Sequence, residues 1–251
     1  MTRAAKTLIL LRHGQSTWNL ENLFTGWEDV RLSPAGSVEA RESGRLMKEA
    51  GLSPQVVHTS LLKRAIHTAD LALDEMDLDW IPVRRSWRLN ERHYGALQGL
   101  NKKETAAKYG EDKVKLWRRS YDVRPPAVDV ADKRHPSHDP RYASVPADLL
   151  PATECLKDVL DRVLPYWKEA ILPDLHDHTC VLVAAHGNSL RALVKYLDGL
   201  TEQEVVDLDI PTAVPRVYEM KSDFTPKSWR YLGDATEIER RAAAVRAQAR
   251  I

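Results

Sequence analysis

The sequence predicts an α/β fold with a mostly parallel central sheet and helices on both faces, in three layers. Short apolar runs alternate with longer segments whose apolar residues recur at helical spacing. Strands separated by segments of helix length are typical of βαβ units, whose helices cover both faces of a sheet. Because 251 residues lie within the size range of single-domain α/β proteins, we expect one domain over residues 1–251.

Five runs are predicted to be strands, because each is short, apolar and bounded by polar or turn-forming residues. They cover residues 7–11, 55–59, 81–83, 179–185 and 216–220. The long segments between most of them favour parallel pairing, since hairpins need only short turns.

The first predicted helix has clear signals at both ends. Ser33 suits the N-cap, Pro34 suits the first helical position, and Gly51 follows the last turn. The small residues Gly36 and Gly44 lie on one face, which lets the helix approach the sheet closely. Comparable apolar periodicity predicts further helices over residues 61–76, 153–172 and 189–197.

Two segments have weaker patterns. Residues 124–151 contain six of the fourteen prolines and little periodicity, so we expect an ordered excursion that rims a site or an interface. In residues 234–251 acidic residues precede arginines, as a helix macrodipole favours, but alanines dominate the apolar positions. Alanine buries little apolar area, so a mobile C-terminal tail is predicted there.

Composition and charge exclude several classes of protein. A net charge of +1 gives no general attraction to nucleic acid or to a membrane surface. No apolar run approaches the length of a membrane span, and residues 8–11 are too short for a signal-peptide core. Cys155 and Cys180 form no C-x-x-C pair, which favours a reducing compartment. We therefore predict a cytoplasmic protein without nucleic-acid or membrane partners.

Two predicted strands end in the same way, in LLRHGQS and in AAHGNS. The carboxyl ends of parallel strands form the crevice where ligands bind, so His13 and His186 are expected to face one site. The glycine after each histidine lets backbone N–H groups approach an anion. A single His-Gly pair is most often an ordinary turn, but two at matching strand ends favour a functional site.

His13 is the candidate nucleophile of this site. A neutral imidazole is nucleophilic near pH 7, whereas a serine needs a base to activate it. Arg12 precedes His13, and Arg64 follows the second predicted strand, so both can reach the same edge of the sheet. Forked guanidinium groups suit phosphoryl oxygens, and we therefore predict phosphoryl transfer to His13.

Two other polar features each allow two interpretations. Glu91, in the loop-like run LNERHYGALQGLNKKE, is either an ordinary ion-pair partner or a general acid and base whose pKa phosphate charge raises. The adjacent Arg118 and Arg119 form either a solvated basic face or a pair of anion ligands. The chain has no Walker, dinucleotide-binding or zinc-protease motif, so neither nucleotide nor metal is predicted.

Together these motifs resemble those of the cofactor-dependent phosphoglycerate mutases of the histidine phosphatase superfamily. The similar blocks are RHGQSTWN, FTGW, LKRAIHT, LNERHYGALQGLNK, WRRSYD and AAHGNSLRALVKYLDG. The RHG triplet alone indicates the superfamily, whereas the ERHYGALQGLNK block and the tandem arginines indicate the mutase branch. The resemblance implies that family's α/β fold and interconversion of 3-phosphoglycerate and 2-phosphoglycerate, in glycolysis and gluconeogenesis.

The resemblance also implies roles for particular residues. His13 becomes a phosphohistidine, Glu91 gives and takes a proton, and the remaining catalytic residues are Arg12, Arg64 and His186. The residues implied to bind substrate are Gly14, Gln15, Ser16, Asn19, Thr25, Gly26, Arg92, His93, Tyr94, Lys102, Arg118, Arg119, Gly187 and Asn188. The implied cofactor is 2,3-bisphosphoglycerate, which primes His13 without a metal. A homodimer is implied as well, with a C-terminal tail that folds over the site.

Two departures and one rival function accompany the resemblance. Gln15 stands where many members have Glu, and Ala213 replaces a more usual Gly, at a cost of about 1 kcal/mol if that backbone has positive φ. The alternative is a histidine phosphatase acting on a small phosphorylated metabolite, in which water accepts the phosphoryl group. A non-catalytic phosphometabolite-binding protein is disfavoured, because the candidate nucleophile and acid are both present.

Overall fold

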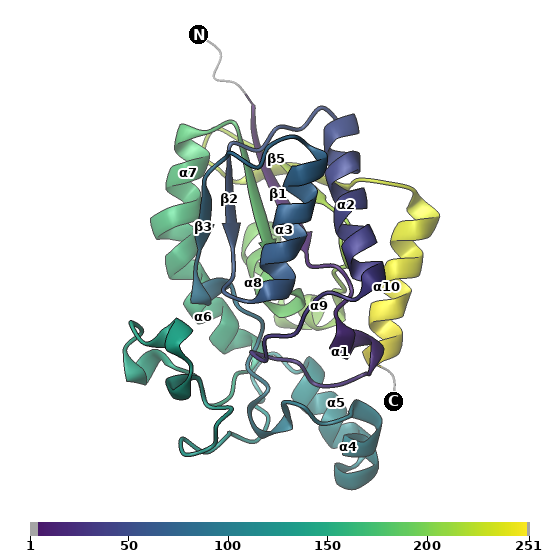
Figure 1. The fold of residues 1–251 in the computed structure, drawn as a ribbon, viewed down its shortest axis with the longest axis vertical. Coiled ribbons are helices and arrows are strands. Elements are labelled where there is room, and N and C mark those ends of the chain that lie inside the picture. The colour runs from purple at the N-terminus through teal and green to yellow at the C-terminus, as the bar shows by residue number, and fades with distance from the viewer. Residues whose placement is uncertain (1–4, 250–251) are drawn as a thin grey trace.

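The computed structural model describes residues 5–249, which form three layers around one sheet (Figure 1). Helices α2 (Pro34–Glu49) and α3 (Lys63–Glu75) cover one face of the sheet. The other face is covered by α6 (Leu156–Tyr166), α7 (Leu172–Asp177) and α8 (Gly187–Asp198). The predicted α/β class with helices on both faces is confirmed.

The sheet has the strand order β3-β2-β4-β1-β5-β6. The strands are β1 Lys6–Arg12, β2 Val56–Thr59, β3 Val83–Arg85, β4 Cys180–Ala185, β5 Arg216–Met220 and β6 Pro226–Tyr231. Strands β1 to β4 run parallel, while β5 is antiparallel to β1 and β6 to β5. Four of the five predicted strands are confirmed, whereas the strand predicted over residues 81–83 overlaps β3 only at Val83. Strand β6 has no predicted counterpart, because its residues are mostly polar and exposed.

The register of the two central strands brings both His-Gly pairs to one edge. Arg12 at the end of β1 pairs with Ala185 at the end of β4, and the His13 N–H donates to the Ala185 carbonyl at 3.0 Å. Leu8 packs toward α6 and α8, whereas Ile9 packs toward α2 and α3. Strands buried on both faces need continuous apolar runs, which is why β1 and β4 were predictable from sequence.

Helix α2 begins as predicted and lies very close to the end of β1. Ser33 Oγ accepts the Gly36 N–H at 3.0 Å, and Pro34 occupies the first turn. A Cβ on Gly14 would lie 2.2 Å from the Gly36 carbonyl oxygen, and a Cβ on Gly36 would lie 1.9 Å from the Gln15 carbonyl oxygen. Both glycines are therefore required for this close approach.

The other helices differ from the prediction in number and in bounds. The predicted helix over residues 153–172 is α6, which continues through a π-helical stretch, Trp167–Ile171, into α7. Helices without predicted counterparts are α1 Thr17–Leu20, α4 Lys102–Tyr109, α5 Glu111–Arg119 and α9 Glu202–Asp207. They are short, so their apolar periodicity is too brief to recognise.

The two segments with weak patterns are both ordered along their described lengths. Residues 124–151 contain three single-turn 3₁₀ helices, Pro136–His138, Pro140–Tyr142 and Ala147–Leu149. Residues 235–249 form helix α10 (Ala235–Ala249), which lies beside α2 in Figure 1. The mobility expected of the tail stays a prediction, and residues 250 and 251 lie outside the described part.

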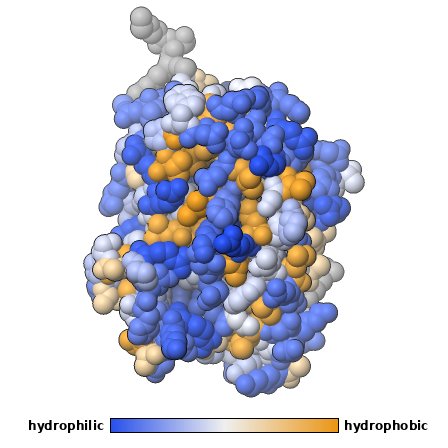
Figure 2. Space-filling view, viewed as in Figure 1, coloured by the Kyte–Doolittle hydropathy of each residue, from blue (hydrophilic) through white to orange (hydrophobic). Residues whose placement is uncertain are grey.

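Membrane-spanning helices are absent from the described residues, because none of the helices in residues 5–249 is long and apolar enough to cross a bilayer. On the face shown in Figure 2, hydrophilic side chains cover most of the surface and apolar ones form small groups between them.

Candidate active site

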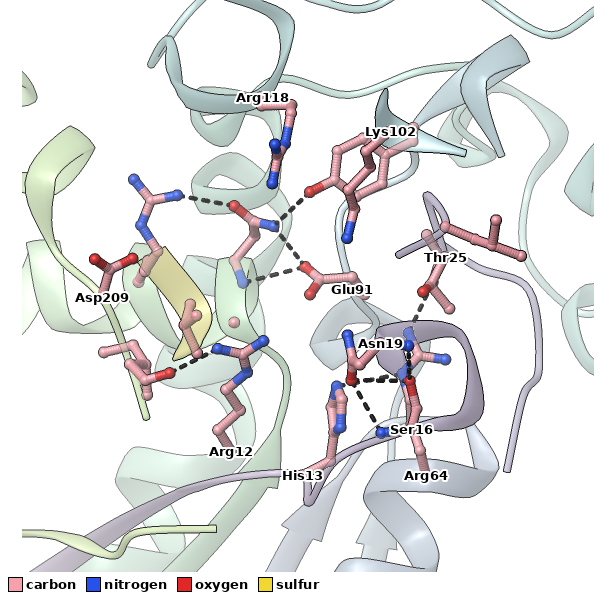
Figure 3. Close-up of a pocket in the computed structure, with 18 of the residues that line it drawn as sticks. Arg12, His13, Ser16, Asn19, Thr25, Arg64, Glu91, Lys102, Arg118 and Asp209 are labelled. Atoms are coloured by element: carbon pink, nitrogen blue, oxygen red, sulfur yellow. Dashed lines mark hydrogen bonds between the residues drawn. The ribbon is translucent and has the colours of Figure 1, made fainter. Parts of the chain in front are cut away.

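A cavity opens at the carboxyl edge of the sheet (Figure 3). Predicted residues that line it are Arg12, His13, Ser16, Asn19, Thr25, Gly26, Arg64, Glu91, Tyr94, Lys102, Arg118, Arg119, Gly187 and Asn188. Unpredicted residues that line it are Leu23, Arg191, Asp209, Ile210 and Val245. The strand ends, the loop around Glu91 and helices α4, α5, α8 and α10 thus converge on one cavity.

His13 is held in one tautomer by its own neighbour. Its Nδ1 lies 2.7 Å from the Gly14 carbonyl oxygen, which can only accept, so Nδ1 carries the proton. Burial, followed by the charges of Arg64 and Arg12, lowers the pKa of His13 well below its usual value, so the ring is neutral. Nε2 therefore keeps its lone pair, which is the form that a nitrogen nucleophile needs.

Arg64 directs its three nitrogens to three different acceptors around His13. Nε donates to His13 Nε2 at 3.3 Å, Nη1 to the Glu28 carbonyl at 2.9 Å and Nη2 to the Gly26 carbonyl at 2.8 Å. Burial lowers the pKa of Arg64 to about 10, so the group is still a cation at neutral pH. A guanidinium locked in this way is preorganised for charge that develops at His13.

His186 lies behind His13 rather than in the cavity wall. The two ring centroids are 5.0 Å apart and the rings meet edge to face, as expected from the matching strand ends. Its Nε2 lies 2.7 Å from Ser60 Oγ. Burial and the Arg64 charge lower the pKa of His186 well below its usual value, so this ring is neutral as well.

Arg12 approaches the cavity from the opposite side of His13. Its Nη1 donates to the Ile210 carbonyl at 2.7 Å, whereas its Nε is buried without a hydrogen-bond partner among the described residues. A buried donor without a partner is costly, which favours an anion beside it. Figure 3 shows the Arg12 side chain at the cavity, across from Glu91 and beside His13.

Glu91 presents two unlike carboxylate oxygens. Oε1 accepts from the backbone N–H groups of Arg92 at 2.8 Å and Asn188 at 3.1 Å, and from Asn188 Nδ2 at 2.9 Å. The backbone of Glu91 is fixed too, because its carbonyl accepts from Trp27 Nε1 at 2.6 Å and Arg162 Nη2 at 2.9 Å. The carboxylate is thus held at the cavity with one oxygen engaged.

Lys102 and Arg118 face His13 across the cavity (Figure 3), and Arg119, which follows Arg118 on α5, lines the cavity as well. Burial, and then the charge of Arg118, lowers the pKa of Lys102 to about 7. Burial lowers the pKa of Arg118 to about 10. Arg119 pairs with Asp209 at 3.0 Å. Cations crowded together in this way favour a polyanionic ligand.

The ends of α1 and the following loop complete the wall near Arg64. Ser16 Oγ donates to Asn19 Oδ1 at 2.9 Å, and Ser16 caps α1 by accepting the Asn19 N–H at 3.2 Å. Because the Asn19 oxygen is engaged, the amide keeps its NH₂ group for a ligand. Gly26, at φ +55, and Thr25 lie in the loop that accepts from Arg64.

Two predicted binding residues beside His13 serve the protein itself. The Gly14 N–H donates to Thr68 Oγ1 at 3.2 Å, so it is engaged within the protein and Gly14 serves close packing instead. Gln15 Oε1 accepts from Ser33 Oγ at 2.9 Å, which supports the cap of α2. Neither residue lines the cavity.

Arg92 and His93 lie beneath the cavity, not in its wall. Arg92 lies over the Tyr94 ring at 4.6 Å and donates to the Arg118 carbonyl at 2.7 Å. His93 Nδ1 accepts the Gly95 N–H at 3.0 Å, and burial lowers the pKa of His93 to about 3. Both side chains are buried within the loop that carries Glu91, and their predicted role as direct ligand contacts stays a prediction.

Several supporting residues were missed by sequence reasoning. Arg162 on α6 pairs with Glu154 at 2.6 Å and donates to the carbonyls of Asn90 and Glu91. A charged residue among the apolar positions of a predicted helix could have indicated it. Arg191 could have been found from its spacing of three from Asn188. Asp209 and Val245 have no comparable sequence signal.

The fold and the cavity together define a class of protein. A neutral histidine whose unprotonated Nε2 accepts from Arg64 lies at a strand end, between two buried arginines and near a carboxylate. Six cationic side chains and two carboxylates line the cavity within the described part of the chain. Such an arrangement is typical of α/β proteins that bind a phosphoryl group beside a histidine nucleophile.

The comparisons with known proteins assign the family. The model of the histidine phosphatase superfamily (branch 1) matches residues 8–230, and this chain belongs to that superfamily. The chain is 62% identical over 244 residues to a 2,3-bisphosphoglycerate-dependent phosphoglycerate mutase of Nitratidesulfovibrio vulgaris, covering 97% of this chain and 98% of the relative. A protein of the same name from Thermobifida fusca is 61% identical over 221 residues, or 88% of this chain and 90% of that one.

Solved structures show the same fold at low identity. A mycobacterial glucosyl-3-phosphoglycerate phosphatase superposes with a TM-score of 0.68 at 24% identity, covering 90% of this chain and 97% of that one. A putative α-ribazole-5′-phosphate phosphatase from Escherichia coli has a TM-score of 0.67 at 20% identity, with 92% and 97% covered. These likenesses support the fold alone.

Proposed function

We propose that this protein is a 2,3-bisphosphoglycerate-dependent phosphoglycerate mutase, which interconverts 3-phosphoglycerate and 2-phosphoglycerate in glycolysis and gluconeogenesis. The observation that carries the proposal is a single cavity with cations at both ends. Arg12 and Arg64 lie beside His13, Lys102 and Arg118 lie across from it, and Arg119 lines the same cavity. A mutase needs both ends, because its ligand carries one phosphoryl group to be transferred and another to be held. The full-length relatives of that name support the proposal.

The residues present fit 2,3-bisphosphoglycerate. The Arg12 Nε donor is buried without a partner within residues 5–249, and the pKa of Lys102 is lowered to about 7 by burial and by Arg118. Anionic groups would remove both costs. Arg12 and Arg64 would hold the phosphoryl group nearer His13, and Lys102, Arg118 and Arg119 the other end. When bound, this ligand supplies the phosphoryl group that primes His13.

The chemistry at His13 follows from its tautomer. Nε2 attacks phosphorus, the P–O bond to the leaving alkoxide breaks, and Nδ1–H stays bonded to the Gly14 carbonyl. Arg12 and Arg64 stabilise charge on the equatorial oxygens throughout. His186 would contribute to the same stabilisation, because its ring centroid is 5.0 Å from that of His13 and its buried Nδ1 has no hydrogen-bond partner among the described residues.

Glu91 moves the proton that the transfer requires. It protonates the alkoxide that leaves when His13 is phosphorylated, and it takes the proton of the substrate hydroxyl when His13 gives the phosphoryl group back. Glu91 is 8% exposed, so we expect its proton to be exchanged with the ligand rather than with bulk water. Asn188 and Gly187 line the wall beside it.

The proposal extends to partners and compartment. Its reaction needs phosphoglycerates as small-molecule substrates, no metal, and neither nucleic acid nor membrane. We also propose a cytoplasmic homodimer, and sedimentation at micromolar concentration would measure the mass directly. Helix α10 supplies Val245 to the cavity wall, which supports a role for the C-terminal segment in covering the ligand.

A coupled assay tests the proposed function. Isomerisation of 3-phosphoglycerate should depend strongly on added 2,3-bisphosphoglycerate and should survive EDTA. Release of inorganic phosphate, measured in parallel, should be much slower. Phosphate release faster than isomerisation would instead identify the alternative, a histidine phosphatase acting on a small phosphorylated metabolite.

Replacement of the proton carrier gives a second test. Glu91→Gln should lower the turnover number about 10²-fold to 10⁴-fold, because the amide cannot take the hydroxyl proton. Its dissociation constant for 3-phosphoglycerate should change far less, since Gln keeps the shape of the side chain. Calorimetric binding beside steady-state turnover makes the comparison, and normal turnover would remove Glu91 from the mechanism.

A further inference from the structure

Arg191 and Asn188 lie one turn apart on α8, and both line the cavity. Arg191 Nη1 donates to Asn188 Oδ1 at 3.0 Å. On its other side, Nε donates to the Val205 carbonyl at 3.2 Å and Nη2 to the Val206 carbonyl at 3.2 Å. The guanidinium is therefore fixed by backbone at the end of α9, and its position does not depend on Asn188.

Arg191 decides which end of the Asn188 amide faces Glu91. A guanidinium has donors only, so the amide must turn its oxygen toward Arg191. Its NH₂ group then faces Glu91, and Nδ2 donates to Oε1 at 2.9 Å. If the amide were flipped, Asn188 Oδ1 would face Glu91 Oε1, and neither oxygen could donate. The NH₂ group would face Arg191, which would leave a buried Arg191 donor without a partner, so both contacts would be unfavourable.

The orientation of Asn188 makes the two oxygens of Glu91 chemically different. Oε1 accepts three N–H groups, from the backbone of Arg92, the backbone of Asn188 and the Asn188 amide. Oε2 faces Gly187 and Arg12, since a Cβ on Gly187 would lie 3.6 Å from Oε2 and 3.4 Å from the Arg12 Cζ. An oxygen that already accepts three donors has no room for a proton, so the proton belongs on Oε2.

We propose that Arg191 is a positioning residue for proton transfer, acting through Asn188 to keep Oε1 of Glu91 saturated and Oε2 reactive. The inference rests on the proposed function. As the substrate oxygen bonds to phosphorus and the His13 N–P bond breaks, the hydroxyl proton passes to Oε2. When His13 is rephosphorylated, Oε2 returns that proton to the leaving alkoxide.

The rates at which two phosphoryl donors phosphorylate His13 distinguish a role in proton transfer from a role in ligand binding or in stabilising the fold. Phosphorylation of His13 by 2,3-bisphosphoglycerate releases an alkoxide that needs a proton, whereas 2,4-dinitrophenyl phosphate releases a stable phenolate that needs none. Arg191→Met should slow phosphohistidine formation from the first donor by about tenfold or more. The rate from the second donor should stay within about twofold, because His13 and the two arginines beside it, Arg12 and Arg64, are unchanged.

Arg191→Lys and a double variant keep the test decisive. The lysine ammonium can still donate to Asn188 Oδ1, so this conservative variant should recover most of the rate with 2,3-bisphosphoglycerate. In an Asn188→Ala background, Arg191→Met should add no further change to the ratio of the two rates. Equal slowing with both donors, or no slowing with either, would overturn the role of Arg191.

A matched control is available in Arg216. This arginine is 2% exposed, is paired with Asp198 and lies outside the cavity. Arg216→Met should lower thermal stability but leave the ratio of the two rates unchanged. A failure of the proposed function gives a different result from a failure of the Arg191 role. The wild-type protein would then phosphorylate His13 from dinitrophenyl phosphate and still not interconvert the phosphoglycerates.

Discussion

The two walls of the cavity hold their cations in different ways. On the sheet side, Arg64 is 1% exposed and all three of its hydrogen bonds go to fixed acceptors, two of them backbone carbonyls. Across the cavity, Lys102 and Arg118 extend from the short helices α4 and α5. There the main effects on the pKa of each are burial and neighbouring charge.

This difference indicates what each wall contributes to catalysis and to binding. A locked guanidinium beside the nucleophile costs no reorganisation when charge develops, which suits the transferring phosphoryl group. Crowded cations gain most when a ligand anion arrives, which suits binding. Changes in the sheet-side wall should therefore affect turnover, and changes in the facing wall should affect affinity.

The largest effect is expected at His13. His13→Ala should remove isomerisation by a factor on the order of 10⁴ or more, because no other group in the wall can carry the phosphoryl group. It should also abolish acid-labile, base-stable incorporation of phosphate from 2,3-bisphosphoglycerate. His67→Ala, on α3 but outside the cavity, is the control. Retained labelling would contradict the covalent mechanism.

A pair of arginine variants contrasts the two walls directly. Arg64→Gln should lower kcat about 10²-fold to 10³-fold, as loss of a preorganised donor does. Arg119→Gln should instead raise KM for 3-phosphoglycerate by about tenfold with little change in kcat, because a charged hydrogen bond to the ligand is lost. Steady-state kinetics measure both, and the same pattern in both variants would refute the division between the walls.

The pH dependence of binding tests whether the charge of Lys102 in the facing wall controls affinity. The pKa of Lys102 is lowered to about 7 by burial and by Arg118, so the lysine loses its charge as pH rises above 7. A bound anion restores the charge, so the dissociation constant for 3-phosphoglycerate should rise up to tenfold per pH unit above pH 7. Calorimetry between pH 6.5 and 8.5, values chosen to span roughly that pKa, makes the measurement.

Two variants at Lys102 serve as its controls. Lys102→Arg stays charged throughout this range and should bind with little dependence on pH. Lys102→Met should bind weakly at every pH, because the cation is gone. A wild-type affinity that is flat across pH 7 to 8, roughly the range in which this lysine titrates, would show that Lys102 does not control binding.

The smallest effect concerns the backbone behind Arg12. Ala213 has φ +48, and its N–H donates to the Arg12 carbonyl at 2.9 Å. Ala213, which stands where the family more usually has Gly, therefore has the positive φ that favours glycine. Ala213→Gly should stabilise the protein by about 1 kcal/mol. Urea unfolding measures the change. Ala243→Gly, exposed on α10, should be destabilising instead, by about 0.5 to 1 kcal/mol.

Much of the fold was predictable because local patterns agree with their surroundings. Strands β1 and β4 are continuous apolar runs, and α2 has a serine cap, an initial proline and a glycine beyond its end. Strand β6 was missed because an edge strand with exposed polar residues has no apolar run. Helices α4 and α5 were missed because eight and nine residues are too few for a clear period.

The same contrast applies to the cavity. The residues at strand ends, His13 and Gly187, and those in the polar blocks, such as Glu91 and Lys102, could be named from sequence and all line it. Gly14, Gln15, Arg92 and His93 were named with them but do not line the cavity; they take part in close packing, helix capping and the loop that carries Glu91, and their contact with a ligand stays a prediction. Position next to a functional residue does not specify where a side chain points.

The sequence by itself determined the apolar strands of the sheet, the strand-end histidines and the cations around them, because these depend on short patterns within one segment. Only the tertiary structure decided which groups hold them. The carbonyls that fix Arg12 and Arg191 belong to Ile210 and Val205, in a segment around α9 without a motif of its own. A backbone carbonyl is the same in every residue, so its role as a partner is set by folding and leaves no mark in the sequence.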